Sequence, residues 1–219
     1  GNEWREAFRK SWEKKGGVIT ADRPANYYTD TDFSAQLTSA LATKPDFMLV
    51  GGPSGATALV IEQARGMGFK GGFVLVDQAK VDVITELLRG RELIGNAIAV
   101  AALRNMPEGG PPQRWAVKYQ SIYKKGATWE ASLHYLMLHS LARAIEAAQS
   151  VDDVYKIRAA YPKALPMTLG DYPTGFPMEL LGITATGRWQ MFTSIQAMTQ
   201  GKLEVINQYA WWVNSEEEF

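Results

Sequence analysis

Two short segments of the sequence carry residues whose types and spacing suit the binding of a small molecule. Residues 51–55 read Gly-Gly-Pro-Ser-Gly after an apolar run. Glycines let a ligand approach the backbone, and the N–H groups at the start of a following helix attract anions. Asp77 and Gln78 follow a second apolar run, and a carboxylate there can hold an ammonium or hydroxyl group. Each segment also has a plainer interpretation: a tight strand-to-helix turn for the first and a helix cap for the second.

The elements around these segments predict a parallel sheet. Short apolar runs at 17–20, 46–50, 73–76 and 93–100 alternate with helical patterns at 33–43, 56–67 and 81–89. Strands without polar alternation, separated by helices, are typical of a parallel sheet that is covered on both faces. We therefore predict a doubly wound, mostly parallel α/β fold. The carboxyl ends of its strands would form a ligand-binding cleft that contains Pro53, Ser54, Gly55, Asp77 and Gln78.

A serine hydrolase is the enzymatic alternative. Residues 52–56 approach the G-x-S-x-G nucleophile elbow and differ from it at the last position, with Ser54 in the nucleophile's place. However, both histidines, His134 and His139, lie within a long apolar helical pattern, whereas a triad base comes from a loop beside the nucleophile. Their spacing of five residues also places them on different faces of the helix, which disfavours a metal pair. We expect no catalytic set, no metal site and no cofactor.

Composition narrows the classes of function further. The 219 residues include 23 Lys and Arg against 23 Asp and Glu, so no net charge would attract nucleic acid or anionic lipid. Cysteine is absent, which excludes thiol nucleophiles and disulfides. The longest apolar run, near residues 131–142, is interrupted by both histidines and is too short to span a membrane. Nucleic acid is therefore not expected as a partner.

Elements outside this alternation are predicted from periodicity and breakers. An amphipathic helix is predicted at residues 2–15, and a Pro/Gly-rich break at 107–112 is the candidate domain boundary. Helices are predicted near 113–125, 129–148 and 151–160, and strands or a hairpin at 188–195 and 203–212. The aromatic residues at helical apolar positions are predicted to be core residues; they include Trp4, Trp12, Trp129 and Tyr135. Tyr27 and Tyr28 lie in a loop, and their role is left open.

Several of these segments together resemble a known family. They are Asp-Thr-Asp-Phe-Ser at residues 30–34, Lys-Pro-Asp at 44–46 before a strand that ends in Gly-Gly, and Glu-Gln-Ala-Arg-Gly-Met-Gly-Phe-Lys-Gly at 62–71. In this order and spacing they resemble the type I periplasmic substrate-binding proteins of ABC importers, in the branched-chain amino acid (Leu/Ile/Val-binding) group. Weaker similarity continues through residues 135–148 and 187–202.

The resemblance implies a solute-binding component of an ABC transporter, located in the periplasm or outside the cell, although no signal peptide is seen in this chain. Such a protein closes two lobes over a small polar ligand and presents it to a membrane permease. The family's ligand-contacting turn and acid would be Pro53-Ser54 and Asp77 here, and Asp77 suits an amino acid's ammonium group. Pro-Ser departs from the aromatic residue that the family often has there, which implies a different side-chain pocket. A ligand-sensing receptor of the same fold is the alternative function.

The resemblance also implies a domain arrangement. Residues 1–112 would be the second lobe without its first strand, and residues 113–219 would be segments of the first lobe with the return tail. In the family, an N-terminal lobe precedes the helix that opens this chain, so we expect a truncated form. A sheet that lacks strands leaves an open edge and uncovered apolar surface. We therefore expect a homodimer or larger assembly.

Overall fold

A computed structural model describes residues 2–76, 78–100, 108–168, 178–185, 187–199 and 202–210, and gives the backbone alone at 192–195 and 202–210. The chain divides into two compact units. Unit 1 comprises Gly1–Val100 with Ile195–Ile206, and unit 2 comprises Ala101–Ser194 with Asn207–Glu218. Each unit is described by itself.

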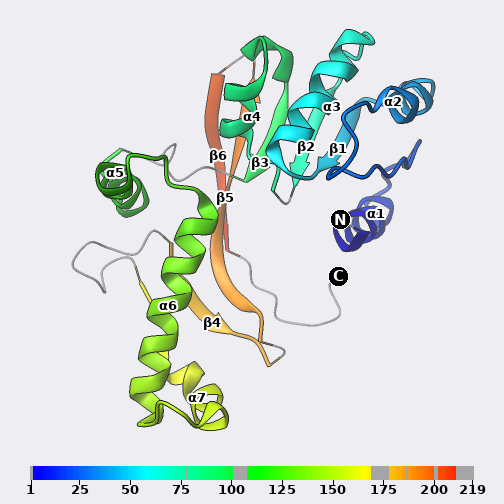
Figure 1. The fold of residues 1–219 in the computed structure, drawn as a ribbon. Coiled ribbons are helices and arrows are strands. Elements are labelled where there is room, and N and C mark those ends of the chain that lie inside the picture. The colour runs from blue at the N-terminus through cyan, green and yellow to red at the C-terminus, as the bar shows by residue number, and fades with distance from the viewer. Residues whose placement is uncertain are drawn as a thin grey trace. The chain divides into compact units, whose positions relative to one another are not determined.

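Unit 1 is the predicted alternation of strands and helices (Figure 1). Its elements are α1 (Asn2–Lys14), α2 (Ser34–Leu41), β1 (Phe47–Gly51), α3 (Ser54–Gly66), β2 (Gly72–Val76), α4 (Val81–Leu87), the 3₁₀ helix η1 (Arg91–Ile94) and β3 (Ala97–Val100). β1, β2 and β3 are parallel, with Phe47 opposite Gly72 and Phe73 opposite Ala97. β3 pairs antiparallel with the end of β5 (Trp189–Thr199). This mostly parallel sheet confirms the predicted fold class.

The core of unit 1 lies between the sheet and the helices that cover it. α3 turns Ala58, Ile61 and Ala64 toward the strands at helical spacing, and all three are buried. Phe73 of β2 and Ile84 of α4 are buried in the same cluster. Because the strands are apolar without alternation, they can be covered on both faces. Their parallel pairing places their carboxyl ends at one edge of the sheet.

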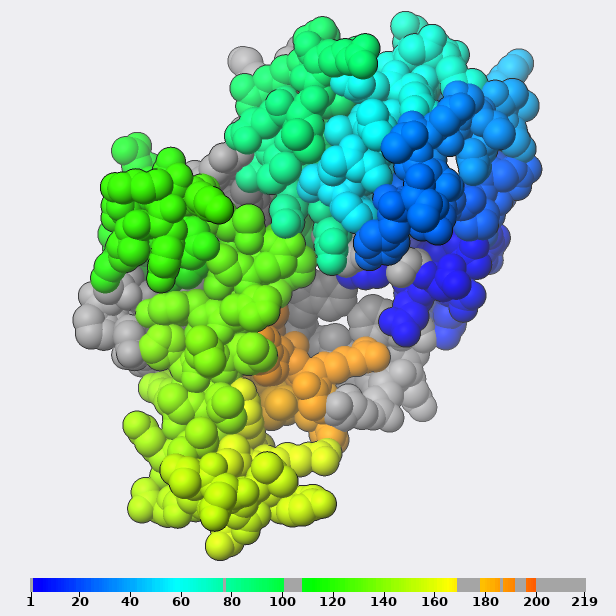
Figure 2. Space-filling model, viewed as in Figure 1, coloured from blue at the N-terminus to red at the C-terminus, as the bar shows by residue number. Residues whose placement is uncertain are grey.

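Unit 2 is built around one long helix. Its elements are α5 (Pro111–Tyr123), α6 (Trp129–Ala148), α7 (Val154–Ala160), the 3₁₀ helix η3 (Tyr161–Ala164), β4 (Leu180–Ile183) and the first part of β5. Leu136 of α6 is fully buried with Met167 and Leu180. α7 packs on α6, and their atoms form one continuous surface in the space-filling view (Figure 2).

The predicted tail strands are confirmed as a pair. The first residues of β5 pair antiparallel with β4, where Met191 lies opposite Leu180. β6 (Lys202–Ala210) also pairs with β5. The loose alternation of apolar residues in this part of the sequence therefore indicated strands correctly.

Two strand predictions need correction. Residues 17–20 are extended but belong to no strand, since a strand exists only where a neighbour completes its hydrogen bonds. The strand predicted at 93–100 begins only at Ala97, because η1 occupies Arg91–Ile94 and Gly95 follows it with φ of +59°. A Cβ atom at Gly95 would lie 2.6 Å from Nη2 of Arg65, so the position between η1 and β3 requires glycine.

One side-chain prediction also differs from the structure. Trp4 is 48% exposed, and α1 contains no buried residue, so the apolar stripe of this helix is not core. At the start of α2, whose N-cap is Phe33, the Asp32 carboxylate accepts hydrogen bonds from the backbone N–H and the hydroxyl of Ser34, and these bonds lower its pKa.

Candidate functional site

A cavity of about 470 Å³ lies at the carboxyl ends of β1 and β2, where open α/β sheets bind their ligands. We call it the strand-end cavity. Its lining comes from the loop after α1, from α2 and from the two strand-to-helix turns. It consists of Pro24, Ala25, Asn26, Tyr27, Tyr28, Asp30, Gln36, Gly51, Gly52, Pro53 and Gln78. Carboxylate, amide and phenol groups therefore gather around one hollow within unit 1.

The sequence-predicted site residues take different positions around this cavity. Pro53 and Gln78 line it. Ser54 and Gly55 begin α3, and neither is among the described residues that form the lining. Asp77 lies outside the residues that the structure describes. Its sequence neighbours Val76 and Gln78 place it directly after the end of β2.

Ser54 joins the two turns. Its hydroxyl donates to the backbone oxygen of Gln78 at 3.0 Å and accepts from the backbone N–H of Lys80 at 3.2 Å. Both hydrogen-bonding roles of the hydroxyl are thus used to hold the turn after β1 against the turn after β2. This contact fixes the distance between the two predicted ligand-binding segments.

The loop at residues 24–30 supplies part of the site that the sequence prediction did not assign. The ring of Tyr27 packs on Phe33 with ring centroids 5.7 Å apart, and burial raises the pKa of Tyr27. The same ring lies so close to Gly52 that a Cβ atom there would be 2.7 Å from Cδ2 of Tyr27. Glycine at position 52 therefore lets the loop close over the end of β1. Tyr28, in contrast, is 87% exposed.

Asp30 adds an acidic group to the strand-end cavity. One carboxylate oxygen accepts from the backbone N–H of Asn26 at 3.0 Å, and the other accepts from the hydroxyl of Thr29 at 2.9 Å. The Asn26 side chain in turn accepts from the N–H of Tyr28. The signal available in the sequence was the Asn/Asp-rich turn pattern, in which such side chains bond to nearby backbone groups.

Residues of the sequence motifs at 30–34 and 62–71 hold this loop in place through hydrogen bonds. Gln63 of α3 accepts a hydrogen bond from the N–H of Phe33 at 2.7 Å and donates to the backbone oxygen of Thr31 at 2.9 Å. Because Gln63 belongs to the segment at 62–71 and Thr31 to the segment at 30–34, the two motifs are in direct contact. The motif spacing thus reflects a structural link that positions the loop.

The histidines provide no metal site among the residues that the structure describes, where no group of three or more metal-binding side chains is found. Nδ1 of His134 lies 2.7 Å from the backbone oxygen of Glu130. His139 packs on the ring of Tyr135, and desolvation together with the charge of Arg143 lowers its pKa. Within the described part of the chain, no helix is long and apolar enough to cross a bilayer.

Comparison with known proteins places these features in a family. The family model described as periplasmic binding protein matches residues 1–193, which is most of the chain. No curated protein sequence is detectably similar to the chain.

Solved structures give the same fold. The leucine-binding protein LivK of Thermotoga maritima has a TM-score of 0.71 and 23% identity, over 93% of this chain and 55% of that one. The branched-chain amino acid transporter substrate-binding protein LivJ of Streptococcus pneumoniae, solved with isoleucine, has a TM-score of 0.66 and 21% identity, over 92% and 55% of the two chains. A periplasmic binding protein of Burkholderia mallei has a TM-score of 0.73 and 17% identity, over 90% and 52%.

The chain therefore spans about half the length of the solved proteins that it matches. Its fold, with the parallel strands and the cavity at their carboxyl ends, is that of the type I periplasmic binding proteins. From the family match over residues 1–193, we conclude that the chain belongs to the periplasmic binding protein family.

Proposed function

We propose that the chain is part of the extracytoplasmic solute-binding component of an ABC transporter and that it contributes the strand-end cavity to an amino-acid site. The observation that carries this proposal is the convergence of the loop at 24–30 with the turns after β1 and β2 around one cavity of about 470 Å³. Supporting it, the similar proteins LivK and LivJ are described as leucine-binding and as solved in complex with isoleucine.

Within this proposal Asp77 holds the ligand's ammonium group. It directly follows β2, and its neighbour Gln78 lines the cavity. A carboxylate in a partly closed site binds an ammonium through charge-assisted hydrogen bonds. Gly52 and Pro53 line the cavity, and the N–H groups of Ser54 and Gly55, which begin α3 directly after Pro53, are proposed as polar contacts for a ligand group that reaches the start of this helix.

The contacts of Ser54 favour binding over hydrolysis. A nucleophilic serine donates its proton to a neighbouring base, but the Ser54 hydroxyl donates to the backbone oxygen of Gln78. The proposed role needs no covalent step.

The proposal also assigns the lobes and the partner. Residues 1–112 are proposed as one lobe of the binding protein, and residues 113–219 as parts of the other lobe. The proposed partner is a permease in the membrane.

Ligand-detected NMR with the full 219-residue chain tests the proposal. The probes are L-leucine, isoamylamine, which lacks the carboxylate, and 4-methylpentanoate, which lacks the ammonium. We expect saturation transfer to leucine and isoamylamine and a weaker signal for 4-methylpentanoate. A site formed by one lobe should bind leucine only weakly, with a dissociation constant of roughly 1 mM, because the other lobe's contacts are not made.

The matched variants are Asp77→Asn and Asp82→Asn. Asp77→Asn should lose about tenfold or more in leucine affinity, because an amide cannot balance the ammonium charge. Asp82 lies in the first turn of α4 and does not line the strand-end cavity, so Asp82→Asn should bind as the unaltered chain does. Equal binding by all three chains, or preference for 4-methylpentanoate, would contradict the assignment.

A further inference from the structure

Polar side chains outnumber apolar ones in the lining of the strand-end cavity. The described lining includes the carboxylate of Asp30, the side-chain amides of Asn26, Gln36 and Gln78, and two tyrosines. Leucine, isoleucine, valine, methionine and phenylalanine are all missing from that described lining. A branched aliphatic side chain is held by apolar contacts, and this part of the site offers few of them. The cavity therefore suits a ligand whose side chain is polar.

The charge around the strand-end cavity is negative. Asp30 is the one charged side chain in the described lining, which contains no lysine, arginine or histidine. Asp77, the residue proposed to hold the ligand's α-ammonium group, directly follows β2 and precedes Gln78. Two carboxylates are thus assigned to one site, and an α-ammonium group balances the charge of one of them. A ligand with a single ammonium group would leave Asp30 without a counterion.

Asp30 meets neutral donors within the described chain. Its two carboxylate oxygens accept from the N–H of Asn26 and the hydroxyl of Thr29, and no cation of the described residues forms an ion pair with it. Because each oxygen of a carboxylate has two lone-pair positions, Asp30 retains acceptor capacity for a ligand. The side chain is half-buried, so a cation bound to it would be partly shielded from water.

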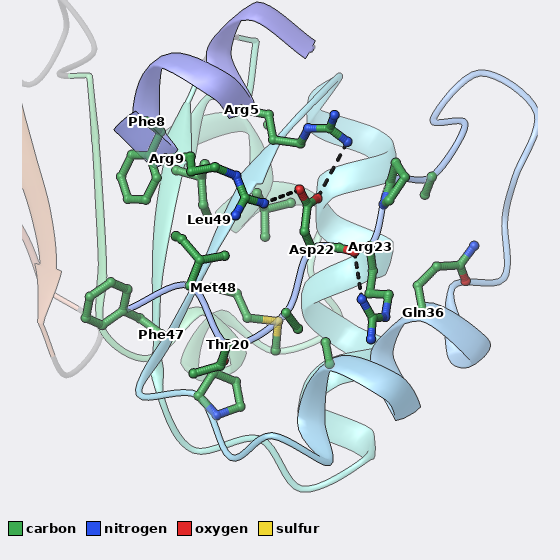
Figure 3. Close-up of a pocket in the computed structure, with 18 of the residues that line it drawn as sticks. Arg5, Phe8, Arg9, Thr20, Asp22, Arg23, Gln36, Phe47, Met48 and Leu49 are labelled. Carbon is green, nitrogen blue, oxygen red and sulfur yellow. Dashed lines mark hydrogen bonds and ion pairs between the residues drawn. The ribbon is translucent and has the colours of Figure 1, made fainter. Parts of the chain in front are cut away.

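Asp22 of unit 1 shows the opposite arrangement. It lines another cavity, of about 550 Å³, to which α1, α2 and β1 also contribute. Arg5 and Arg9 both reach toward its carboxylate (Figure 3). The chain itself therefore supplies the cations for the acid in that cavity. It supplies none from the described residues for Asp30, which leaves that charge to a ligand.

The loop around Asp30 is held in place before any ligand binds. The hydrogen bond from the N–H of Asn26 closes the turn that ends at Asp30. The next residue, Thr31, is tied to α3 through its backbone oxygen, which accepts from Gln63 at 2.9 Å. A binding group on a pre-ordered loop loses less conformational freedom when the ligand arrives. Asp30 is thus positioned to discriminate between ligands.

We propose that Asp30 determines the specificity of the amino-acid site by binding a cationic group at the end of the ligand's side chain. The preferred ligand is then a diamino acid, of which lysine and ornithine are examples. This inference rests on the proposed function, in which Asp77 holds the α-ammonium group. The side-chain amides of Gln36 and Gln78 have no hydrogen-bond partner among the described residues, so their oxygens can accept further bonds from the ligand.

Ligand-detected NMR with the full 219-residue chain compares L-lysine with two matched amino acids. L-Norleucine has the same four-carbon side chain without the terminal ammonium, and Nε-acetyl-L-lysine keeps the nitrogen without its charge. We expect lysine to bind about tenfold or more tightly than either, because it alone forms a charge-assisted hydrogen bond with Asp30.

Variants separate the side-chain contact from the α-ammonium contact. Asp30→Asn removes the charge and keeps the side-chain shape, so the preference for lysine over norleucine should fall to about twofold or less with norleucine affinity unchanged. Asp32→Asn is the matched control, since Asp32 is exposed and does not belong to the described lining; it should retain the preference. Asp77→Asn should weaken lysine and norleucine by a similar factor.

The possible failures are distinguishable. Equal binding of lysine and norleucine by the unaltered chain, or a lysine preference that Asp30→Asn retains, would overturn the role of Asp30 and leave the Asp77 site in place. Absence of binding by lysine, norleucine and leucine alike would contradict the proposed function, and this specificity with it.

A second measurement needs no variant and decides the question if far-UV circular dichroism shows that Asp30→Asn does not fold. In the isotope-labelled, unaltered chain, the amides of Asn26 and Asp30 should shift on titration with lysine and much less with norleucine, because the lysine side chain alone reaches the carboxylate that bonds to Asn26. Equal shifts of these amides with both amino acids, or none with lysine, would overturn the proposal.

Discussion

Arg65 of α3 connects the turn before β2 with η1. Its guanidinium donates to the backbone oxygens of Leu93 and Ile94 on one side and of Phe69 and Gly71 on the other. It also lies over the ring of Phe73, 4.7 Å from the centroid. Burial lowers its pKa. One side chain therefore satisfies carbonyls of the turn before β2 and of η1, a role for which the planar guanidinium is suited.

Replacing Arg65 by Lys should destabilise unit 1 by about 2–4 kcal/mol, because an ammonium cannot reach carbonyls on both sides and leaves some of them unpaired. Urea unfolding monitored by circular dichroism measures the change. Arg89→Lys is the matched control, since the Arg89 side chain is 89% exposed and meets Glu62 only at 3.7 Å; it should change stability by less than about 0.5 kcal/mol. Equal effects of both substitutions would refute this role of Arg65.

His139 should make unit 2 less stable in mild acid. Desolvation first, and the charge of Arg143 second, hold its pKa below 6.5 in the folded protein. Between the lowered folded-state pKa and the unfolded-state pKa, the unfolded chain binds more protons than the folded one, so stability falls as pH falls from about 6.5 toward the folded-state pKa. Thermal unfolding at pH 7.5 and 5.5 should show a smaller acid-induced drop in Tm for His139→Gln than for the unaltered chain.

His134→Gln controls for the loss of a histidine from the same helix, at an exposed position whose ring bonds to its own helix. If His139→Gln retains the full acid-induced drop, the pKa of His139 does not govern it.

Elements, rather than single residues, decide how the loop at 24–30 meets β1. Neither the Tyr27–Gly52 contact nor the Gln63 bridge to Thr31 and Phe33 follows from periodicity, because both join residues far apart in the sequence. The sequence shows the motifs at 30–34 and 62–71, but it does not show that hydrogen bonds of Gln63 join them. The position of Asp30 in the strand-end cavity depends on this loop and was missed for the same reason.

Gly52→Ala should move the loop away from the end of β1. The new methyl group would lie 2.7 Å from Cδ2 of the Tyr27 ring, closer than van der Waals radii allow, at a cost of about 1–3 kcal/mol. Tyr27→Leu should relieve most of this cost in the double variant, which double-mutant analysis of urea unfolding detects as coupling. Gly55→Ala, at a position with open space around its Cβ, is the control. Additive effects of Gly52→Ala and Tyr27→Leu would show that the two residues do not meet.

Sequence patterns predicted nearly every helix and strand of the described chain, because periodicity and breakers are local signals. They failed where structure depends on a distant partner. Residues 17–20 have the composition of a strand, but none of the described strands pairs with them. The apolar stripe of α1 predicted a core that is not buried. In both cases the local pattern is right, and the partner that would bury or pair it is not among the described residues.

At the scale of the whole molecule, membership in the periplasmic binding protein family rests on a match over residues 1–193. The described units supply the parallel strands and the strand-end cavity, while the matched solved proteins are almost twice as long. The proposed amino-acid site draws on the strand-end cavity, at the carboxyl ends of β1 and β2.

The most direct measurement is a titration of the isotope-labelled 219-residue chain with L-leucine, followed by amide NMR shifts. The account predicts saturable shifts that are largest at Gly52, Ser54, Gly55 and Gln78, at the carboxyl ends of β1 and β2. Shifts confined to Trp12 and Phe47, at the opposite end of β1, would contradict it. So would the absence of any saturable shift at leucine concentrations of roughly ten times the expected 1 mM dissociation constant.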